Sequence, residues 1–116
     1  MSKIIINTST SYQAEAATKA LLSGGFIAKK AYINYNLKKG VPLPEEVHNY
    51  PLILEGRLTG FPINIYVNSV TAGYGGTGPN ALVDILNAAG FEFDENDILT
   101  PQLAGSNGLI RFELTK

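Results

Sequence analysis

A chain of 116 residues has the length of one ordinary domain, so we expect residues 1–116 to form a single domain. A hydrophobic fraction of 45% against 16% charged residues argues against a disordered chain, because it allows a core. The lack of cysteine excludes disulfide bonds, thiolate metal sites and cysteine nucleophiles, and the formal charge of −1 argues against a nucleic-acid or anionic-lipid partner.

The first predicted unit is a strand followed by a helix. A β-branched run at residues 3–7, KIIIN, predicts a short buried strand. Its three isoleucines are too few for a signal-peptide core or a membrane span, so we expect a cytoplasmic protein without a membrane partner. The hydroxyl residues at 8–11 offer N-caps for a helix over residues 12–23, and Gly24 and Gly25 suit its C-terminal end.

Residues 26–37 predict a long strand whose apolar side Lys29 interrupts. The side chains expected on that apolar side are Ile27, Ala31, Ile33, Tyr35 and Leu37. The segment also interleaves lysines with aromatic residues, as do sheets that stack the bases of single-stranded nucleic acid. Because the whole chain is not basic, we favour an edge strand protected by lysines and expect no nucleic-acid partner.

A loop and a hairpin come next. Residues 38–51 hold three prolines and one glycine, which predicts a connecting loop. The alternating segments 52–58 and 63–68 predict a β-hairpin with its turn at Thr59 and Gly60.

The clearest predicted element is the second helix. Four apolar residues fall at helical spacing and form one stripe: Leu82, Ile85, Leu86 and Ala89. Pro79 suits the first turn of this helix, and Gly90 suits its C-terminal end. Beyond it, residues 91–99 and 109–114 predict two strands, with a turn at 104–108.

These elements predict an α+β fold, with an antiparallel or mixed sheet and two helices on one face of it. The fold is built on two strand–helix units. A ferredoxin-like arrangement with extra strands is one topology that two such units generate.

The two units resemble each other in sequence. Residues 4–10, IIINTST, align with residues 65–71, IYVNSVT, and both units end in Gly-Phe. The offset is 61 residues at Asn7 and Asn68 but 65 at Phe26 and Phe91, so the second unit has four extra residues, and they fall in its glycine-rich stretch. Ordering four glycines costs about 0.5–1 kcal/mol each relative to alanine, which favours a function that offsets the cost.

The glycine-rich stretch TAGYGGTGPN, residues 71–80, is the candidate ligand site. Its glycines can adopt positive φ and expose N–H groups at a helix N-terminus, where an anion is favoured. Thr77 adds a hydroxyl donor, and Tyr74 could lie against a base. The candidate ligand-binding residues are Gly73, Tyr74, Gly75, Gly76, Thr77, Gly78 and Asn80, with Thr8, Ser9 and Thr10 as a second wall if the two strands lie side by side and point the same way.

Neither common phosphate-binding motif is complete here. A Walker loop ends in Gly-Lys-Ser/Thr, whereas this stretch has Gly78, Pro79 and Asn80. The dinucleotide pattern G-x-G-x-x-G matches at 73–78, but no acidic residue lies at the expected distance and the chain is too short for a doubly wound sheet. A purely structural corner between strand and helix therefore stays open as the alternative for this loop.

Three functions follow from these patterns. The first is a cytoplasmic, homo-oligomeric module that binds a nucleotide or another phosphorylated small molecule and acts as a sensor or sequestering protein, with Lys3 or Arg57 as countercharge. The second is a protein-interaction or self-assembling structural protein without a small ligand. The third, a phosphate-handling enzyme, lacks an evident general base, since Asp84 and His48 are only nominal choices, so we expect a non-enzyme.

We expect neither a cofactor nor a metal site. His48 is the single histidine, and the acidic run at 94–98 lacks the glycine and final glutamate of a calcium loop.

Overall fold

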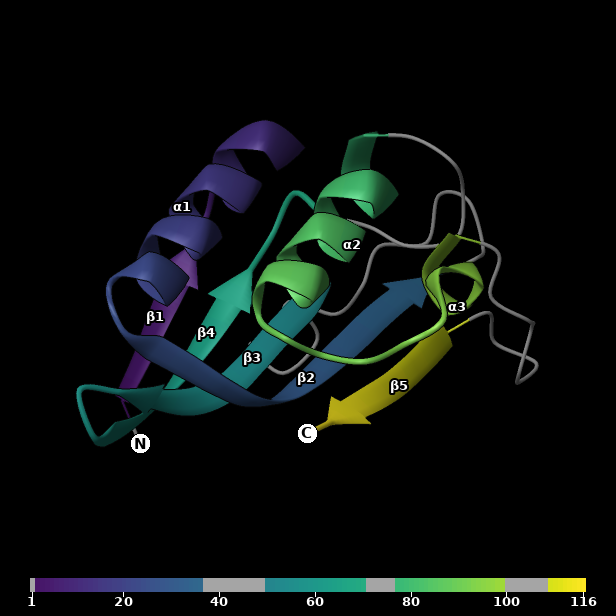
Figure 1. The fold of residues 1–116 in the computed structure, drawn as a ribbon. Coiled ribbons are helices and arrows are strands. Elements are labelled where there is room, and N and C mark those ends of the chain that lie inside the picture. The colour runs from purple at the N-terminus through teal and green to yellow at the C-terminus, as the bar shows by residue number, and fades with distance from the viewer. Residues whose placement is uncertain (1, 37–49, 71–76, 100–108) are drawn as a thin grey trace.

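The structure of the protein is a computed structural model that describes residues 2–36, 50–70, 77–99 and 109–116 (Figure 1). The elements in chain order are β1 (Ser2–Ile6), α1 (Ser11–Ser23), β2 (Phe26–Asn36), β3 (Leu52–Leu58), β4 (Phe61–Val67), α2 (Thr77–Ala88), α3 (Glu95–Leu99) and β5 (Leu109–Thr115). The predicted loop at 38–51 and the predicted turn at 104–108 fall almost wholly outside the described residues.

The strands form one mixed sheet in the order β1-β4-β3-β2-β5. Strands β1 and β4 pair in parallel, and the other neighbouring pairs are antiparallel. The predicted α+β class with a mixed sheet is therefore confirmed. The order differs from a ferredoxin-like sheet, because two strands separate β1 from β2 and β1 lies at an edge.

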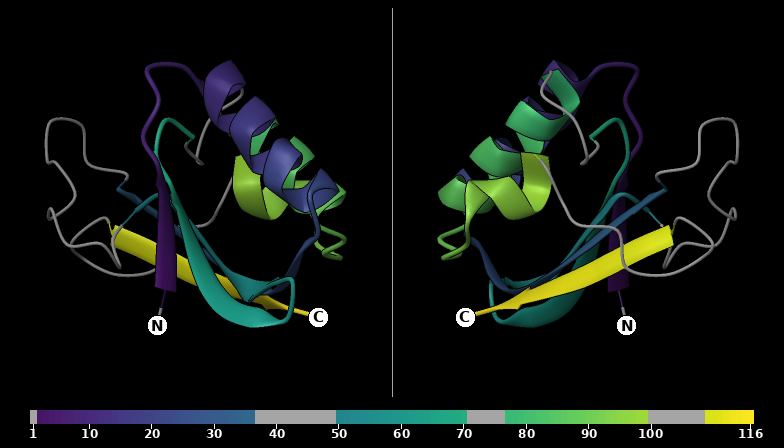
Figure 2. Two further views of the ribbon diagram at one scale, coloured as in Figure 1. Left: turned by 90° about the vertical axis from the view of Figure 1, so that its left-hand side faces the viewer. Right: turned by 90° about the vertical axis from the view of Figure 1, so that its right-hand side faces the viewer.

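Helices α1 and α2 lie side by side on one face of the sheet, as predicted (Figures 1 and 2). The apolar stripe of α2, Leu82, Ile85, Leu86 and Ala89, is buried against that face. The sheet contributes Ile6, Ala31, Ile33, Leu52, Leu54, Ile65 and Val67 to the same core. Thr18 of α1 is also fully buried, and its hydroxyl donates to the Ala14 carbonyl at 2.8 Å, which satisfies it inside the core.

Strand β2 contains a bulge that changes which of its residues face the core. Ala28 pairs with Gly56 and Lys30 with Glu55, so Lys29 is the extra residue. An extra residue shifts the in–out alternation by one position. Ile27 is consequently 56% exposed, so placing it on the apolar side was wrong, whereas Ala31 and Ile33 are buried as predicted. The Tyr35 side chain and Leu37 lie outside the described residues.

The predicted hairpin is confirmed, with β3 and β4 joined by Thr59 and Gly60. Both turn residues have positive φ, 50° for Thr59 and 90° for Gly60, the arrangement of a type I′ turn. A β-branched side chain at positive φ is strained, because its Cβ crowds the backbone.

Replacing Thr59 with asparagine should raise the free energy of unfolding by about 0.5–1 kcal/mol, because asparagine adopts the left-handed conformation more readily. Thermal unfolding of the two proteins measures the gain. Gly60→Ala, at φ 90°, should move stability in the opposite direction, and a Thr59→Asn protein less stable than wild type would contradict this description of the turn.

The segment after α2 does not form the strand predicted over residues 91–99. Gly90 has a φ of 87° and ends α2, and the Phe91 N–H donates to the Leu86 carbonyl at 3.1 Å. Asp94 then starts α3, since its Oδ1 accepts from the Asn96 N–H at 2.9 Å. Local capping by Asp94 therefore prevails over the alternating pattern of the sequence. None of the helices in the described ranges combines the length and the apolar composition that a membrane span needs.

Candidate functional site

The candidate site lies where β1 and β4 end. The two parallel strands pair with a constant offset of 61 residues, from Ser2 opposite Ile63 to Ile6 opposite Val67. This offset is the one at which the two strand–helix units align in sequence. The two aligned segments are therefore neighbouring parallel strands. Both finish at the same end of the sheet, and each is followed by a helix.

Side chains from both units meet just beyond the strand ends. The Asn68 Nδ2 donates to Asn7 Oδ1, and the Thr8 N–H donates to Asn68 Oδ1 at 2.8 Å. Ser69, at a φ of 61°, donates from its hydroxyl to the Thr8 carbonyl. The Asn68 N–H donates to the Ile6 carbonyl at 3.0 Å and continues the ladder of the sheet. Asn68 thereby ties the two strand-to-helix connections together.

The predicted second wall, Thr8 to Thr10, is engaged in starting α1. Thr10 is the N-cap, and its hydroxyl accepts from the Gln13 N–H at 3.1 Å. Gln13 Oε1 accepts from the Ser9 hydroxyl at 2.9 Å and from the Ser9 N–H at 3.2 Å. The Thr8 hydroxyl donates to the Thr10 carbonyl at 3.0 Å. Only the backbone of Thr8 has contacts with Asn68 and Ser69 among these bonds, and the three hydroxyls all bond within residues 8–13.

The predicted glycine-rich wall falls only partly on described residues. Gly73, Tyr74, Gly75 and Gly76 lie outside them, as does the side chain of Thr77, which opens α2. Gly78 is buried and Asn80 is exposed, both in the first turn of α2. Pro79 lies in this first turn, as predicted, and its side chain is fully buried.

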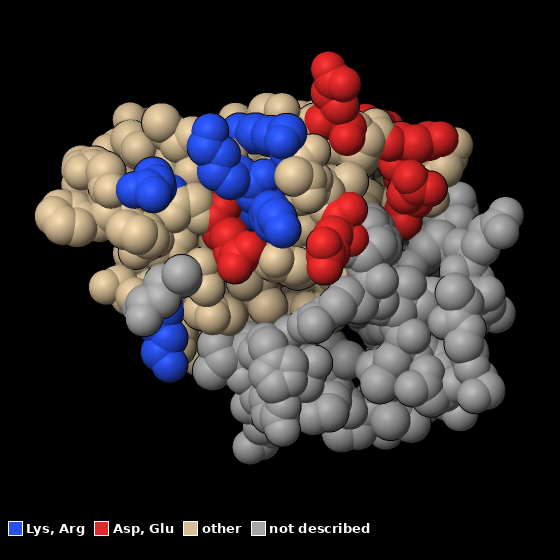
Figure 3. Space-filling view, turned by 90° about the horizontal axis from the view of Figure 1, so that it is seen from below, with Lys and Arg blue, Asp and Glu red and all other residues tan. Residues whose placement is uncertain are grey.

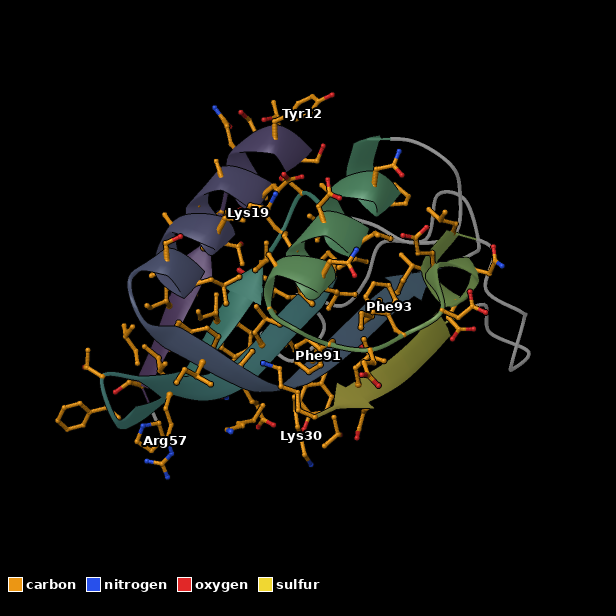
Figure 4. All side chains as sticks on the ribbon, viewed as in Figure 1. Tyr12, Lys19, Lys30, Arg57, Phe91 and Phe93 are labelled. Atoms are coloured by element: carbon orange, nitrogen blue, oxygen red, sulfur yellow. The ribbon has the colours of Figure 1, made fainter. Side chains whose placement is uncertain are left out.

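The two basic residues suggested as countercharges do not lie at the end of the sheet where β1 and β4 finish. Arg57 donates from Nη1 to the Gly60 carbonyl at 2.9 Å, beside the β3–β4 turn. Figure 4 shows Arg57 at the end of the molecule opposite Tyr12, which is in the first turn of α1. Lys3 is near the start of β1, whereas the candidate site follows its end. Both suggestions are therefore wrong.

The two strand-to-helix connections at the site carry no charged side chain. Residues 7–14 and 68–83 contain no Asp, Glu, Lys or Arg. The first turns of α1 and α2 carry no acidic residue, in contrast to α3, which has Glu95 and Asp97 there. The positive ends of the two longer helices thus face no carboxylate of their own, a condition that favours an anionic group beside them.

Asn7, Asn68 and Ser69 were not among the predicted site residues. The repeat aligned Asn7 with Asn68, and that alignment was the available signal. It gave no reason to assign their side chains a role, because a contact between them depends on parallel pairing of strands 61 residues apart.

The face of the sheet opposite the helices, seen in Figure 3, carries side chains of both charges. Glu55 of β3 has Lys30 as its cross-strand neighbour on one side and Asn64 on the other. The Tyr32 hydroxyl donates to Glu55 Oε2 at 2.8 Å. Because Glu55 lies between Lys30 of β2 and Asn64 of β4, this part of the face is not a continuous basic track for a nucleic-acid backbone.

Only one of the two nominal catalytic residues is among the described residues. Asp84 is exposed in the second turn of α2, and His48 lies outside the described residues. Within the described part of the chain, no group of three or more His, Asp or Glu side chains is placed to hold a metal ion.

No family model, no curated protein sequence and no solved structure matches this chain.

Proposed function

We propose that the protein is a small-molecule binding module that holds a nucleotide or another phosphorylated ligand where β1 and β4 end. The ligand's phosphate lies against the N-terminus of α2, and the Asn7–Asn68 contact supports the floor of the site. The module acts as a sensor of the ligand or sequesters it. A cytoplasmic location and assembly into a homo-oligomer remain part of this proposal.

One observation carries the proposal, namely the parallel pairing of the two units at an offset of 61 residues. In sheets with helices, ligands bind beyond the carboxyl ends of parallel strands, where strand-to-helix connections converge. Here β1 and β4 are the parallel pair, and a helix follows each of them beyond its carboxyl end. The second connection is also the longer one, by four residues of a glycine-rich stretch.

The lack of charged side chains supports a phosphate held by neutral donors. Backbone N–H groups and hydroxyls can hold a phosphate without a lysine or arginine, because several partial positive charges converge on it. No carboxylate occurs in residues 7–14 or 68–83 to repel the ligand.

Asn80→Asp should weaken binding while leaving the fold intact. Asn80 is exposed in the first turn of α2, where a carboxylate stabilises the helix by about 0.3–1 kcal/mol but repels a neighbouring phosphate. We expect affinity for the best-binding nucleotide to fall at least about tenfold, equivalent to about 1.4 kcal/mol. Titration calorimetry measures the affinity, and thermal unfolding verifies the fold.

The matched control is Asn87→Asp, the same change at an exposed position in the last turn of α2. It alters the net charge equally but lies at the other end of the helix, so binding should be retained. Equal affinities of the two variants would contradict a phosphate at the N-terminus of α2. Turnover of the bound ligand by wild-type protein would favour the enzyme alternative over a binding module.

A further inference from the structure

The outer edge of β1 presents unused backbone hydrogen-bonding groups. Strand β1 ends the sheet and pairs with β4 alone. The Ile6 carbonyl accepts from the Asn68 N–H, so the backbone groups of Ile6 face β4. Because these groups alternate in direction along a strand, those of Lys3, Ile5 and Asn7 point away from the sheet. No strand among the described residues pairs with them.

This edge lacks the features that usually protect an edge strand. It contains neither proline nor a bulge, its single charged residue is Lys3, and Ile5 is 44% exposed. The opposite edge of the sheet differs. Strand β5 carries Arg111 and Glu113, and Lys116 follows it directly. The edge at β1 is therefore the one suited to pair with a further strand.

We propose that β1 pairs antiparallel with β1 of a second copy of this chain, so that the two sheets become one continuous sheet. The two-fold axis passes at Ile5. Ile5 then lies opposite Ile5 of the second copy, and Lys3 lies opposite Asn7 of the second copy. Both apolar side chains become covered, and the outward backbone groups of Lys3, Ile5 and Asn7 all find partners.

The charge pattern excludes the register with its two-fold axis at Lys3. An axis at Lys3 would place two ammonium groups directly opposite each other, which destabilises a strand pair. An axis at Ile5 separates the two lysines by several residues. The interface is self-complementary, as a two-fold dimer requires.

Helix α1 can add to the interface. Its charged pair faces α2: Lys19 Nζ lies 2.8 Å from Glu15 Oε2, a hydrogen bond that raises the pKa of Lys19, and Asp84 of α2 adds to the rise. On the opposite side of α1, by helical spacing, lie the uncharged residues Gln13 and Ala17. A two-fold axis perpendicular to the sheet keeps both α1 helices on the same face of the joined sheet. The sides of the two helices that carry Gln13 and Ala17 then approach each other.

The helix contact matters because of area. A stable interface buries about 800 Å² on each partner, out of the 6513 Å² that this chain exposes in total. Five strand residues alone cover less than that, so both β1 and α1 must take part. This inference rests on the homo-oligomer of the proposed function and names its interface, but no ligand enters it, so the dimer tests and the binding tests can fail separately.

The test uses a disulfide trap, which is clean because the chain contains no cysteine. In a hydrogen-bonded antiparallel pair, opposing Cα atoms lie about 5.5 Å apart, within the range that a disulfide spans. Under mild oxidation at low micromolar concentration, Ile5→Cys should convert mostly to a covalent dimer on a non-reducing gel. Ile27→Cys is the matched control, since Ile27 is 56% exposed on the same face of the sheet but lies in β2, three strands away from the β1 edge. Equal crosslinking of the two variants would overturn the proposal.

A second measurement uses light scattering after size exclusion. Wild type and Ile27→Lys should have the mass of a dimer, and Ile5→Lys, which opposes two ammonium groups at the axis, that of a monomer. A monomeric wild type, or a dimer that persists in Ile5→Lys, would overturn this interface. Circular dichroism verifies that each variant is folded.

Discussion

Gly56→Ala should lower the free energy of unfolding by about 3 kcal/mol or more. A Cβ built on Gly56 would lie 2.0 Å from the Ile27 carbonyl oxygen and 2.9 Å from the Ala28 Cα. These are backbone atoms of the bulged strand β2, so no side-chain rotation relieves the clash. Either β2 and β3 separate at this point or the bulge rearranges, and each loses ladder hydrogen bonds.

Denaturant unfolding measures this loss, with Gly24→Ala as the control. Gly24 has a φ of −81°, and its added Cβ would lie 3.2 Å from the Ala20 carbonyl oxygen, a contact that a small shift relieves. We expect that control to change stability by less than about 1 kcal/mol. A Gly56→Ala protein as stable as Gly24→Ala would show that β2 does not approach β3 as closely as the bulge requires.

Ile33→Ala and Ile27→Ala should differ greatly although both isoleucines lie in β2. Ile33 is fully buried beneath the helices, so its truncation should cost about 2–5 kcal/mol through lost burial and the cavity that remains. Ile27 is 56% exposed, and its truncation should cost less than about 1 kcal/mol.

The same unfolding experiment measures both variants. Simple alternation from position 27 to position 33 places the two side chains on the same side, and only the bulge at Lys29 separates them. Similar losses in the two variants would therefore contradict the bulge.

The elements with local signals are predictable from this sequence. The stripe of Leu82, Ile85 and Leu86, with Gly90 behind it, is sufficient to define α2. Alternation on both sides of Thr59 and Gly60 is sufficient to define the hairpin. In each case the periodicity and the signal at the end of the element indicate the same structure, so tertiary contacts do not change the prediction.

The features that depend on pairing or competition are not predictable in this way. The bulge at Lys29 requires knowing that β3 presents Gly56 at that point, because only glycine allows the close approach. In the segment that forms α3, the alternating pattern favours a strand, whereas the Asp94 cap favours a helix. Packing of the buried Ile98 also favours the helix.

The candidate site is intermediate between these cases. The offset of 61 residues in the repeat is the register of β1 against β4, so the meeting of the two connections follows from sequence once the strands are known to be neighbours. The Asn7–Asn68 contact and the use of Thr10 as a helix cap become visible only with side-chain geometry. The role of Gly73, Gly75 and Gly76 in ligand binding stays a prediction, since they lie outside the described residues.

Native mass spectrometry of the wild-type protein with a panel of linear and cyclic nucleotides tests the binding function most directly. Our account predicts a discrete added mass with at least one nucleotide, reduced by Asn80→Asp and retained by Asn87→Asp. A wild-type protein that binds no member of the panel would contradict the account, and the glycine-rich segment would then be a structural corner between β4 and α2.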